Sequence, residues 1–414
     1  MSAASRIAGR TFAALAVPNY RKYFVGQVIS NSGTWMQSVA QGWLILQLTH
    51  HNGFYLGVSV ALQYLPMLLL GSYGGLLVDR SSKRKVLYVT QSTAGLSALV
   101  LGFLVATHHA QVWQVFLLSL ALGVSNMFDV PARQAFIQEM VGRDLIANAV
   151  SLNSALMNSG RLIGPAISAG VIAAWGTAAC FFVNAGSYLA VLLALLSMDG
   201  SKLSPIRTVS RAKGQVMLGL RYVKDTPILR RPLIAVAIVG TFAFNFTVTL
   251  PLLVQRTFHD QRAGDYGILL SAMGLGAILG GLTIAHRARP SLKLMSVLGI
   301  LFGIFMAAVA LSPNRFMATI LLVPTGAFSI AFVSTGNATL QLNSTEEMRG
   351  RVMSLHATAF LGSTPIGAPI IGVICNLTNP RVGLGVGAAL TLLTGLWLMA
   401  QSRDVPVQPV VNSD

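Results

Sequence analysis

The feature that most constrains this chain is a series of twelve apolar segments, each close to the length that crosses a lipid bilayer. A helical span needs roughly 20 mostly apolar residues. The segments lie near residues 22–48, 54–78, 86–106, 112–132, 149–173, 177–197, 232–258, 264–285, 292–311, 316–340, 352–375 and 382–400. Lipid offers no partners to the backbone, so each segment is expected to be an α-helix. The sequence predicts an all-α polytopic membrane protein with twelve transmembrane helices.

Composition excludes the common alternatives. Only 10% of the 414 residues are charged, against about 25% in soluble domains. The two cysteines, Cys180 and Cys375, both lie in apolar runs, so no disulfide framework is expected. Residues 1–20 lack the apolar core of a cleavable signal peptide. We expect a multi-pass membrane protein.

The formal net charge of +17 has an uneven distribution. With a cytoplasmic N-terminus, 24 of the 29 basic residues fall in inside segments. Only Arg256, Arg262, Arg315 and Arg381 fall outside, and Arg161 lies within a span. This asymmetry follows the positive-inside rule and places both termini in the cytoplasm. Because the charge is spread over many short loops, a nucleic-acid partner is not expected.

Short repeats divide the chain into two similar halves. Gly74-Gly75-Leu76 recurs as Gly280-Gly281-Leu282 at an offset of 206, and a basic loop follows each copy. Two six-helix halves with a site between them is a common plan of secondary transporters. We expect a first half over 1–197, a cytoplasmic linker over 198–231, a second half over 232–402 and a cytoplasmic tail over 403–414. Within the linker, the pattern of residues 216–224 fits either an amphipathic helix on the anionic inner leaflet or a solvated connection between the halves.

Two motifs resemble those of the major facilitator superfamily. Residues 75–87 resemble its loop 2–3 signature, although Ser81 and Ser82 stand where a Gly is usual, and residues 160–165 resemble the core of its antiporter motif. Segments 131–136, 219–223, 288–290 and 348–352 look most like the branch that contains siderophore (enterobactin) exporters and macrolide efflux proteins. The resemblance implies the major facilitator fold, a monomer in the bacterial plasma (inner) membrane, and export of siderophore-like or drug-like amphipathic molecules by alternating access. The alternatives left open are an importer of the same superfamily and a non-transporting membrane scaffold.

The energy source is constrained by what the sequence lacks. It contains no Gly-Lys dipeptide and therefore no phosphate-binding P-loop. His50-His51 and His108-His109 fall in predicted outside loops without metal-ligand spacing. We therefore expect neither an enzyme nor a resident cofactor or metal. Transport would be driven by an ion gradient, with H⁺ as the expected coupling ion, or would be facilitated diffusion.

The resemblance gives the basic loop after the second span a second role besides topology. It implies that Asp79, Arg80, Lys83 and Arg84 latch the cytoplasmic ends of the halves in the outward-facing state. Retention of basic residues inside is the alternative. In the antiporter-like motif, Gly160 and Gly164 share one helix face and permit close packing, and Pro165 removes a backbone donor.

Charged residues inside spans mark functional sites by default. Asp129 lies near the cytoplasmic end of the fourth span, and Arg133 follows one turn later, where the two can pair. Asp129 is expected either in a structural or latch role near Lys83 or in proton coupling. Arg161 lies close to the bilayer midplane, either as a packing residue or as an anchor for an anionic or catecholate oxygen of a substrate. The other candidate substrate-binding residues are Asn31, Gln37, Gln41, Gln63 and Asn158, with Asn245, Asn337 and His356 in the second half.

Overall fold

The computed structural model describes residues 11–204, 215–259, 262–287 and 290–402, and throughout these ranges the regular structure is helical. The first half contains α2 (Pro18–Leu48), α3 (Gly53–Arg80), α4 (Lys83–Ala106), α5 (Val112–Val141) and α6 (Ile146–Leu196), with short 3₁₀ turns at Ala13–Ala16 and Gly200–Lys202. The second half contains α8 (Pro227–Phe242), α9 (Phe246–Leu252), a π-helical turn over Leu253–Thr257, α10 (Ala263–Arg287), α11 (Leu292–Leu311), α12 (Arg315–Leu342), α13 (Glu346–Leu361), α14 (Thr364–Leu377) and α15 (Pro380–Gln401). The predicted all-α class is confirmed.

Ten helical segments in the described residues are long and apolar enough to span a membrane. One of them, α6, has 51 residues and contains a break at Gly176, whose φ is +79°. An unbroken helix of that length would measure about 77 Å, more than twice the ~30 Å hydrocarbon core. A further helix, α2, has 31 residues but carries many polar side chains and is not among the ten. The count of twelve spans stays a prediction.

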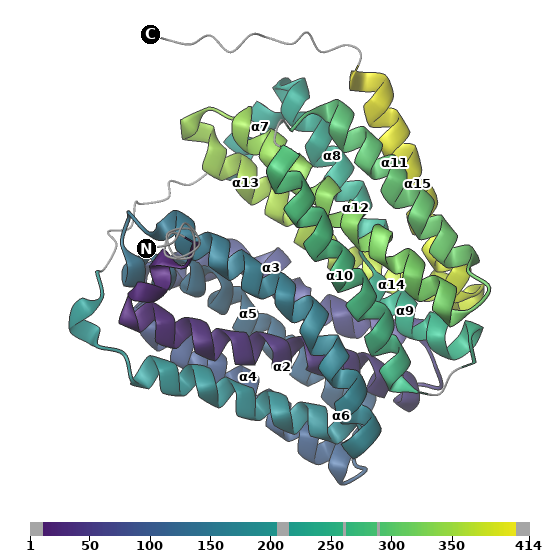
Figure 1. Cartoon of the computed structure of the whole chain (residues 1–414), viewed down its shortest axis with the longest axis horizontal. Helices are drawn as coiled ribbons and strands as arrows, with labels where there is room; N and C mark the ends of the chain where they lie inside the picture. Colours follow the sequence, from purple (N-terminus) through teal and green to yellow (C-terminus); the bar gives the residue numbers. More distant parts are fainter. Residues whose placement is uncertain (1–10, 205–214, 260–261, 288–289, 403–414) are drawn as a thin grey trace, which may run out of the picture.

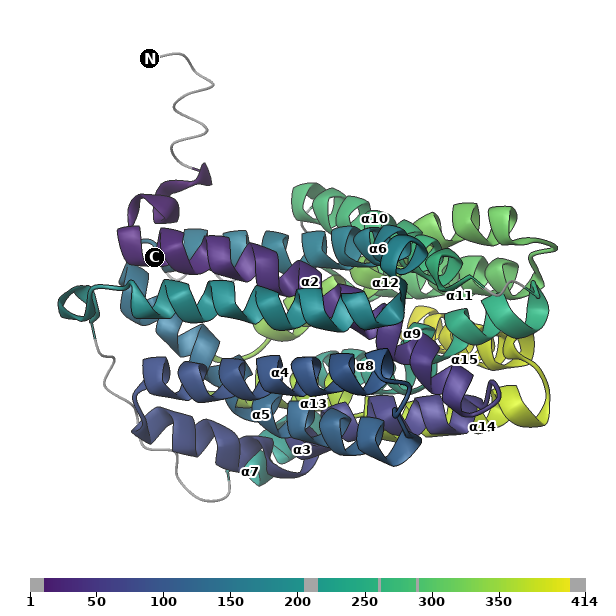
Figure 2. The same cartoon turned by 90° about the horizontal axis from the view of Figure 1, so that it is seen from below.

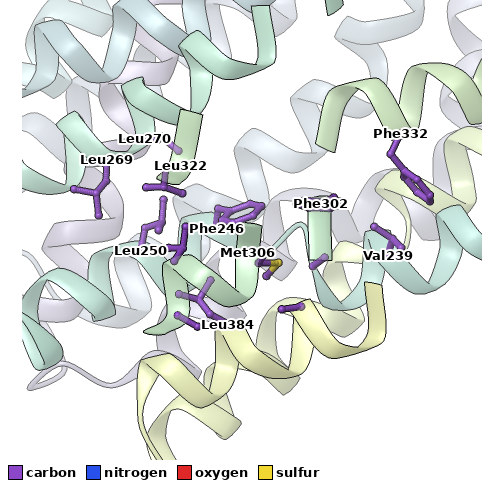
Figure 3. Packing of buried hydrophobic residues seen from close by; sticks show 14 of the residues in the cluster. Val239, Phe246, Leu250, Leu269, Leu270, Phe302, Met306, Leu322, Phe332 and Leu384 are labelled. Carbon is purple, nitrogen blue, oxygen red and sulfur yellow. The ribbon is translucent and has the colours of Figure 1, made fainter. Parts of the chain in front are cut away.

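The same packing pattern occurs in each half. In the first half α3 packs on α5 and α4 packs on α6, and in the second half α10 packs on α12 and α11 packs on α15. Figure 1 shows two helical bundles side by side, the first in purple to teal and the second in teal to yellow, and Figure 2 shows the same helices from below. The second bundle encloses an apolar cluster that includes Phe246, Phe302, Met306 and Leu384 (Figure 3).

Two predicted spans of the second half are interrupted. One breaks into α8 and α9 at residues 243–245, and the other breaks into α13 and α14 at residues 362–363. Discontinuous spans are tolerated where the freed backbone lines a cavity or is buried in protein.

The halves meet along two helix pairs, α3 with α14 and α6 with α10. At both pairs glycines bring the backbones together. A Cβ added at Gly267 would lie 2.6 Å from the Pro165 carbonyl oxygen, and one added at Gly53 would lie 3.0 Å from the Gly372 carbonyl oxygen. These contacts belong to the helix parts that the charge pattern places toward the outside.

A short helix, α7 (Gln215–Asp225), lies within the predicted linker and packs against α13. Val223 is buried with Leu340 and Val352, whereas Met217, Leu218 and Leu220 are exposed. The helix expected from the 216–224 pattern is therefore present, and its contact with lipid stays a prediction. Residues 205–214 of the linker and the tail after residue 402 lie outside the described residues.

Candidate functional site

A cavity of about 480 Å³ opens within the first half. Its described lining comes from α2, α3, α4, α5 and α6, with Thr247 of α9 as the contribution of the second half. Of the residues predicted from the sequence, it brings together Asn31, Gln37, Gln41, Gln63, Asp129 and Arg133. Its volume lies within the ~300–1,000 Å³ range of pockets that hold drug-sized ligands.

The polar residues of α2 both line the cavity and bind neighbouring helices. Asn31 donates from Nδ2 to the Leu156 carbonyl at 3.0 Å, and Gln37 accepts a 2.6 Å hydrogen bond from Asn184. Gln41 donates to Ser119 at 2.9 Å. These bonds fix the side chains that face the cavity, so its polar surface is held in a defined shape.

The carboxylate of Asp129 lies at the centre of a buried network. Its Oδ2 pairs with the Arg133 guanidinium, and its Oδ1 accepts hydrogen bonds from Thr90 at 2.9 Å and Gln91 at 2.7 Å. Arg133 also donates to Gln27 Oε1 at 2.5 Å. The expected pairing of Asp129 with Arg133 is present. The neighbours of the carboxylate are these residues rather than Lys83.

Three buried polar atoms around this network have no protein partner in the described residues: Gln27 Nε2, Gln91 Oε1 and the Tyr23 hydroxyl. Buried polar atoms normally find a protein or water partner. The network therefore retains one amide donor, one amide acceptor and one hydroxyl for water or a bound molecule. Two of the three residues, Gln27 and Gln91, line the cavity.

Arg161 lies midway between Ile146 and the break at Gly176. Its Cζ is 5.3 Å from the centre of the Trp35 ring, and Trp35 lines the cavity. A guanidinium over an indole face gains a cation–π interaction. Within the described residues this guanidinium has no hydrogen bond or ion pair. The Arg161 guanidinium is therefore separated from the cavity by the side chain of Trp35.

The antiporter-like motif is packed between two helices. A Cβ at Gly160 would overlap Asn31 Nδ2, and one at Gly164 would lie 2.7 Å from the Ser32 carbonyl oxygen of α2. On the other side, the backbone of Arg161 and Pro165 approaches Gly274 and Gly267 of α10. The motif therefore joins α2 of its own half to α10 of the other half.

The structure places four other candidates away from this cavity. Asn158 donates to Ser154 of its own helix at 2.9 Å, and Asn337 accepts from Gln341 of its own helix at 2.9 Å. Asn245 lies at the break between α8 and α9 and donates to Thr241 at 2.7 Å. His356 is 6% exposed and stacks on Phe360. The three Asn side chains each make one hydrogen bond within four residues of their own position. Asn245 Oδ1 and His356 Nε2 have no protein partner in the described residues.

The basic loop between α3 and α4 binds its own half in this structure. Lys83 donates to the Asp79 carbonyl at 3.0 Å, and Arg84 donates to the Leu195 carbonyl at 2.6 Å, at the C-terminal end of α6. Cations at a helix C-terminus are favoured by the exposed carbonyls and the helix dipole. Arg80 is exposed. The latch between halves expected for this loop stays a prediction.

Sequence reasoning missed several residues of the cavity, among them Gln27, Thr90, Gln91 and Asn184. A signal was present for Gln27, because it precedes Asn31 by four residues and so shares its helix face. Thr90 and Gln91 begin a polar stretch, residues 90–93, within a mostly apolar run. The described residues contain no group of three His, Cys, Asp or Glu side chains able to hold a metal.

Comparison with known proteins adds a family match over almost the whole chain. A family model described as transmembrane secretion effector matches residues 9–411. The enterobactin exporter EntS of Shigella boydii is 27% identical over 92% of this chain and 91% of its own. The staphyloferrin A transporter of Staphylococcus aureus is 24% identical over 86% and 89%. The multidrug efflux pump Tap of Mycolicibacterium fortuitum is 26% identical over 87% and 92%.

Solved structures show the same fold at lower identity. The nucleoside transporter NupG aligns with a TM-score of 0.75 and 12% identity over 94% of this chain and all of that chain. A bacterial homolog of the human lysosomal transporter Spinster aligns with a TM-score of 0.71 and 13% identity over 93% and 96%. The two-bundle architecture is that of these transporters.

Proposed function

Because this chain belongs to the transmembrane secretion effector family of major facilitator transporters, we propose that it exports small amphipathic organic molecules, siderophore-like or drug-like, by alternating access. Three relatives at 24–27% identity carry names of siderophore or drug transporters. The exporter would lie in the bacterial inner membrane with both termini in the cytoplasm, as the basic-residue asymmetry predicts.

The observation that carries the proposal is the cavity of about 480 Å³ with its polar lining. A scaffold protein has no use for a polar cavity between spans, because every polar group transferred from water into the membrane costs free energy unless it is hydrogen-bonded there. Trp35, Tyr64 and Tyr188 add aromatic surface to the same cavity. The combination suits a molecule with apolar rings and several hydrogen-bonding oxygens.

Charge favours an anionic or oxygen-rich cargo over a cation. Asp129 is neutralised by Arg133, so the uncompensated charge beside the cavity is that of Arg161. A cation entering this poorly screened space would be repelled by the guanidinium, and an oxyanion would be attracted. Guanidinium also offers a fork of donors to paired oxygens. We therefore place a siderophore ahead of a cationic drug.

We propose the proton motive force as the energy source, with Asp129 as the candidate proton carrier among the acids of the spans. Protonation of this carboxylate would require that Arg133 first find another partner, since the two are paired in a buried network. The conformation fits an inward-facing state, because the halves are joined at α3–α14 and α6–α10, on the side predicted to be outside.

Uptake into inverted membrane vesicles tests cargo and direction together. A labelled catecholate siderophore and a cationic dye are offered to wild type, Arg161→Gln and Arg161→Lys, with Arg21→Gln as a control at an exposed position. A hydrogen bond to a charged group contributes about 1.5–3 kcal/mol, so Arg161→Gln should weaken siderophore binding by about ten- to a hundredfold if the cargo displaces Trp35 and bonds the guanidinium. Arg161→Lys should recover only part of it, because the donor fork is lost.

Three outcomes would each overturn one part of the proposal. Uptake of the siderophore only into right-side-out vesicles would indicate an importer. Dye transport that is equal in all variants, with no siderophore flux in any, would end the siderophore assignment. Full siderophore transport by a folded Arg161→Gln would show that Arg161 does not act on cargo.

A further inference from the structure

Polar residues join the two halves on the side predicted to be outside. We name this set the outer lock; it consists of His51, Asn52 and Gly53 from the first half and Gln255, Arg256 and Asn376 from the second half. None of its members lines the cavity described above. The two halves must separate here for the cavity to open outward, so these contacts distinguish the two end states of a transport cycle.

Asn376, at the end of α14, is the central member of the outer lock. Its Oδ1 accepts a hydrogen bond from the Gly53 backbone N–H at 2.8 Å, and its Nδ2 donates to Asn52 Oδ1 at 2.5 Å. Asn52 also caps α3 by accepting from the Phe54 N–H at 2.9 Å. One amide of the second half thus uses both of its polar atoms on the first turn of α3 in the first half, where backbone donors have no partner within the helix.

Arg256 holds Asn376 in place from within the second half. It donates to Asn376 Oδ1 at 3.2 Å and to the Cys375 carbonyl at 3.0 Å. The Cys375 carbonyl belongs to the last turn of α14, whose carbonyls lack helical partners, and a cation there is favoured. Arg256 lies in the π-helical turn Leu253–Thr257, a rare conformation that is frequent at functional sites.

A second contact crosses between the halves beside the first. His51 Nδ1 and Gln255 Oε1 are 2.5 Å apart, and the Gln255 amide nitrogen has no partner among the residues that the structure describes. At Gly53 the backbones of α3 and α14 are nearly in contact. A Cβ added there would lie 2.7 Å from the Leu252 side chain and 3.0 Å from the Gly372 carbonyl oxygen. The side-chain bonds therefore sit on an interface that is already closely packed.

We propose that the outer lock holds the transporter in its present conformation, and that Asn376 is the residue whose bonds must break before the cavity opens outward. The proposal rests on alternating access but not on the identity of the cargo. Each bond exchanges for water when the halves part, so its loss shifts a population and does not unfold a helix. The lock is a property of the conformational equilibrium and can be measured without transport.

Spin-label distances measure this equilibrium directly. Labels are placed at exposed positions 109 and 316 on the predicted outside and at 85 and 347 on the predicted inside, after Cys180 and Cys375 are replaced by Ala. Asn376→Ala removes two bonds across the halves. It should lengthen the outer distance, shorten the inner distance and shift the population ratio by roughly five- to fiftyfold. Asn376→Asp keeps the acceptor for Gly53 but loses the donor to Asn52, and its effect should be smaller.

Asn379→Ala is the matched control. Asn379 is three residues away and its Oδ1 accepts from the Val382 N–H at 3.0 Å, so it caps α15 without crossing between the halves. Its loss should leave both distances unchanged. Identical distance distributions in wild type, Asn376→Ala and Asn379→Ala would overturn the proposal. So would equal shifts in the two Ala variants, because that would indicate general loosening of the outer ends.

A disulfide across the lock provides the second test. In the same Cys-free background, His51→Cys with Gln255→Cys should cross-link on oxidation, stop transport and recover it on reduction, while each single variant should be unaffected by oxidant. Continued transport by the cross-linked protein would overturn the proposal. If distances respond as expected but neither siderophore nor dye is carried, the lock stands and the proposed cargo fails.

Discussion

Removing the charge of Asp129 should destabilise the first half strongly, because the change leaves Arg133 buried without its counter-ion. The carboxylate is 3% exposed and accepts hydrogen bonds from Thr90, Gln91 and Arg133. In Asp129→Asn the single amide oxygen can accept either from Arg133 or from Thr90 and Gln91. The NH₂ group then faces the remaining hydrogen-bond donors. Breaking one partner of a buried ion pair costs about 3–5 kcal/mol. Because the site borders a cavity that water can enter, we expect the lower end, about 3 kcal/mol.

A double-mutant cycle isolates the interaction. Arg133→Gln should cost less, about 2 kcal/mol, because Asp129 keeps the hydrogen bonds from Thr90 and Gln91. The double variant Asp129→Asn/Arg133→Gln carries no unpaired charge, so it should be at least as stable as Asp129→Asn alone. Equilibrium unfolding by SDS in mixed micelles, followed by tryptophan fluorescence, gives the four free energies. Effects of the two single changes that add within about 0.5 kcal/mol would refute the reasoning, since additivity indicates independent sites.

Further changes test other parts of the structure. Gly160→Val should lower thermal stability in detergent and abolish transport, because its side chain would displace Asn31 from the α2–α6 contact; a wild-type melting profile would contradict this packing. Arg84→Gln should lower stability by about 1–2 kcal/mol in the same SDS titration, since it removes the donor to the Leu195 carbonyl. Asp79→Asn should insert normally but slow transport if the basic loop acts as a latch, and an unchanged rate would rule the latch out. Cysteine at position 109 should react with an impermeant thiol reagent from outside and cysteine at position 83 should not; the reverse would invert the topology.

The helical class was predictable because lipid permits few alternatives. Ten helical segments of the described residues are long and apolar enough to span a membrane, although two predicted spans share α6 and two others are broken. Gly160 and Gly164 lie against α2, as small residues in a span allow. The pairing of Asp129 with Arg133 followed from spacing on one helix. The spans and the Asp129–Arg133 pair are local in sequence, whereas the partners of Gly160 and Gly164 on α2 were not predicted.

The parts that sequence reasoning could not supply depend on contacts between distant segments. Periodicity gave no means to separate Asn31, which faces the cavity, from Asn337, which binds its own helix at 2.9 Å. The partners of Arg84 lie more than 100 residues away, and its role at the end of α6 requires the packed bundle. The break at 243–245 contains no proline, so the sequence carried no strong signal for it.

The cavity is lined almost entirely by the first half of the chain, so mutations in the two halves should have different effects. Nearly all of its described lining is encoded before the linker, whereas the helices after the linker contribute Thr247 and supply the opposing surfaces of the interface. If this cavity holds the cargo, as we propose, a recombination event within the linker would transfer cargo choice together with the upstream segment. Whether such a hybrid alternates between its two conformations would depend on how closely the glycine contacts at α3–α14 and α6–α10 still pack. Selection for a new cargo can thus act on one half of the gene while the other half is held constant by the requirement to close.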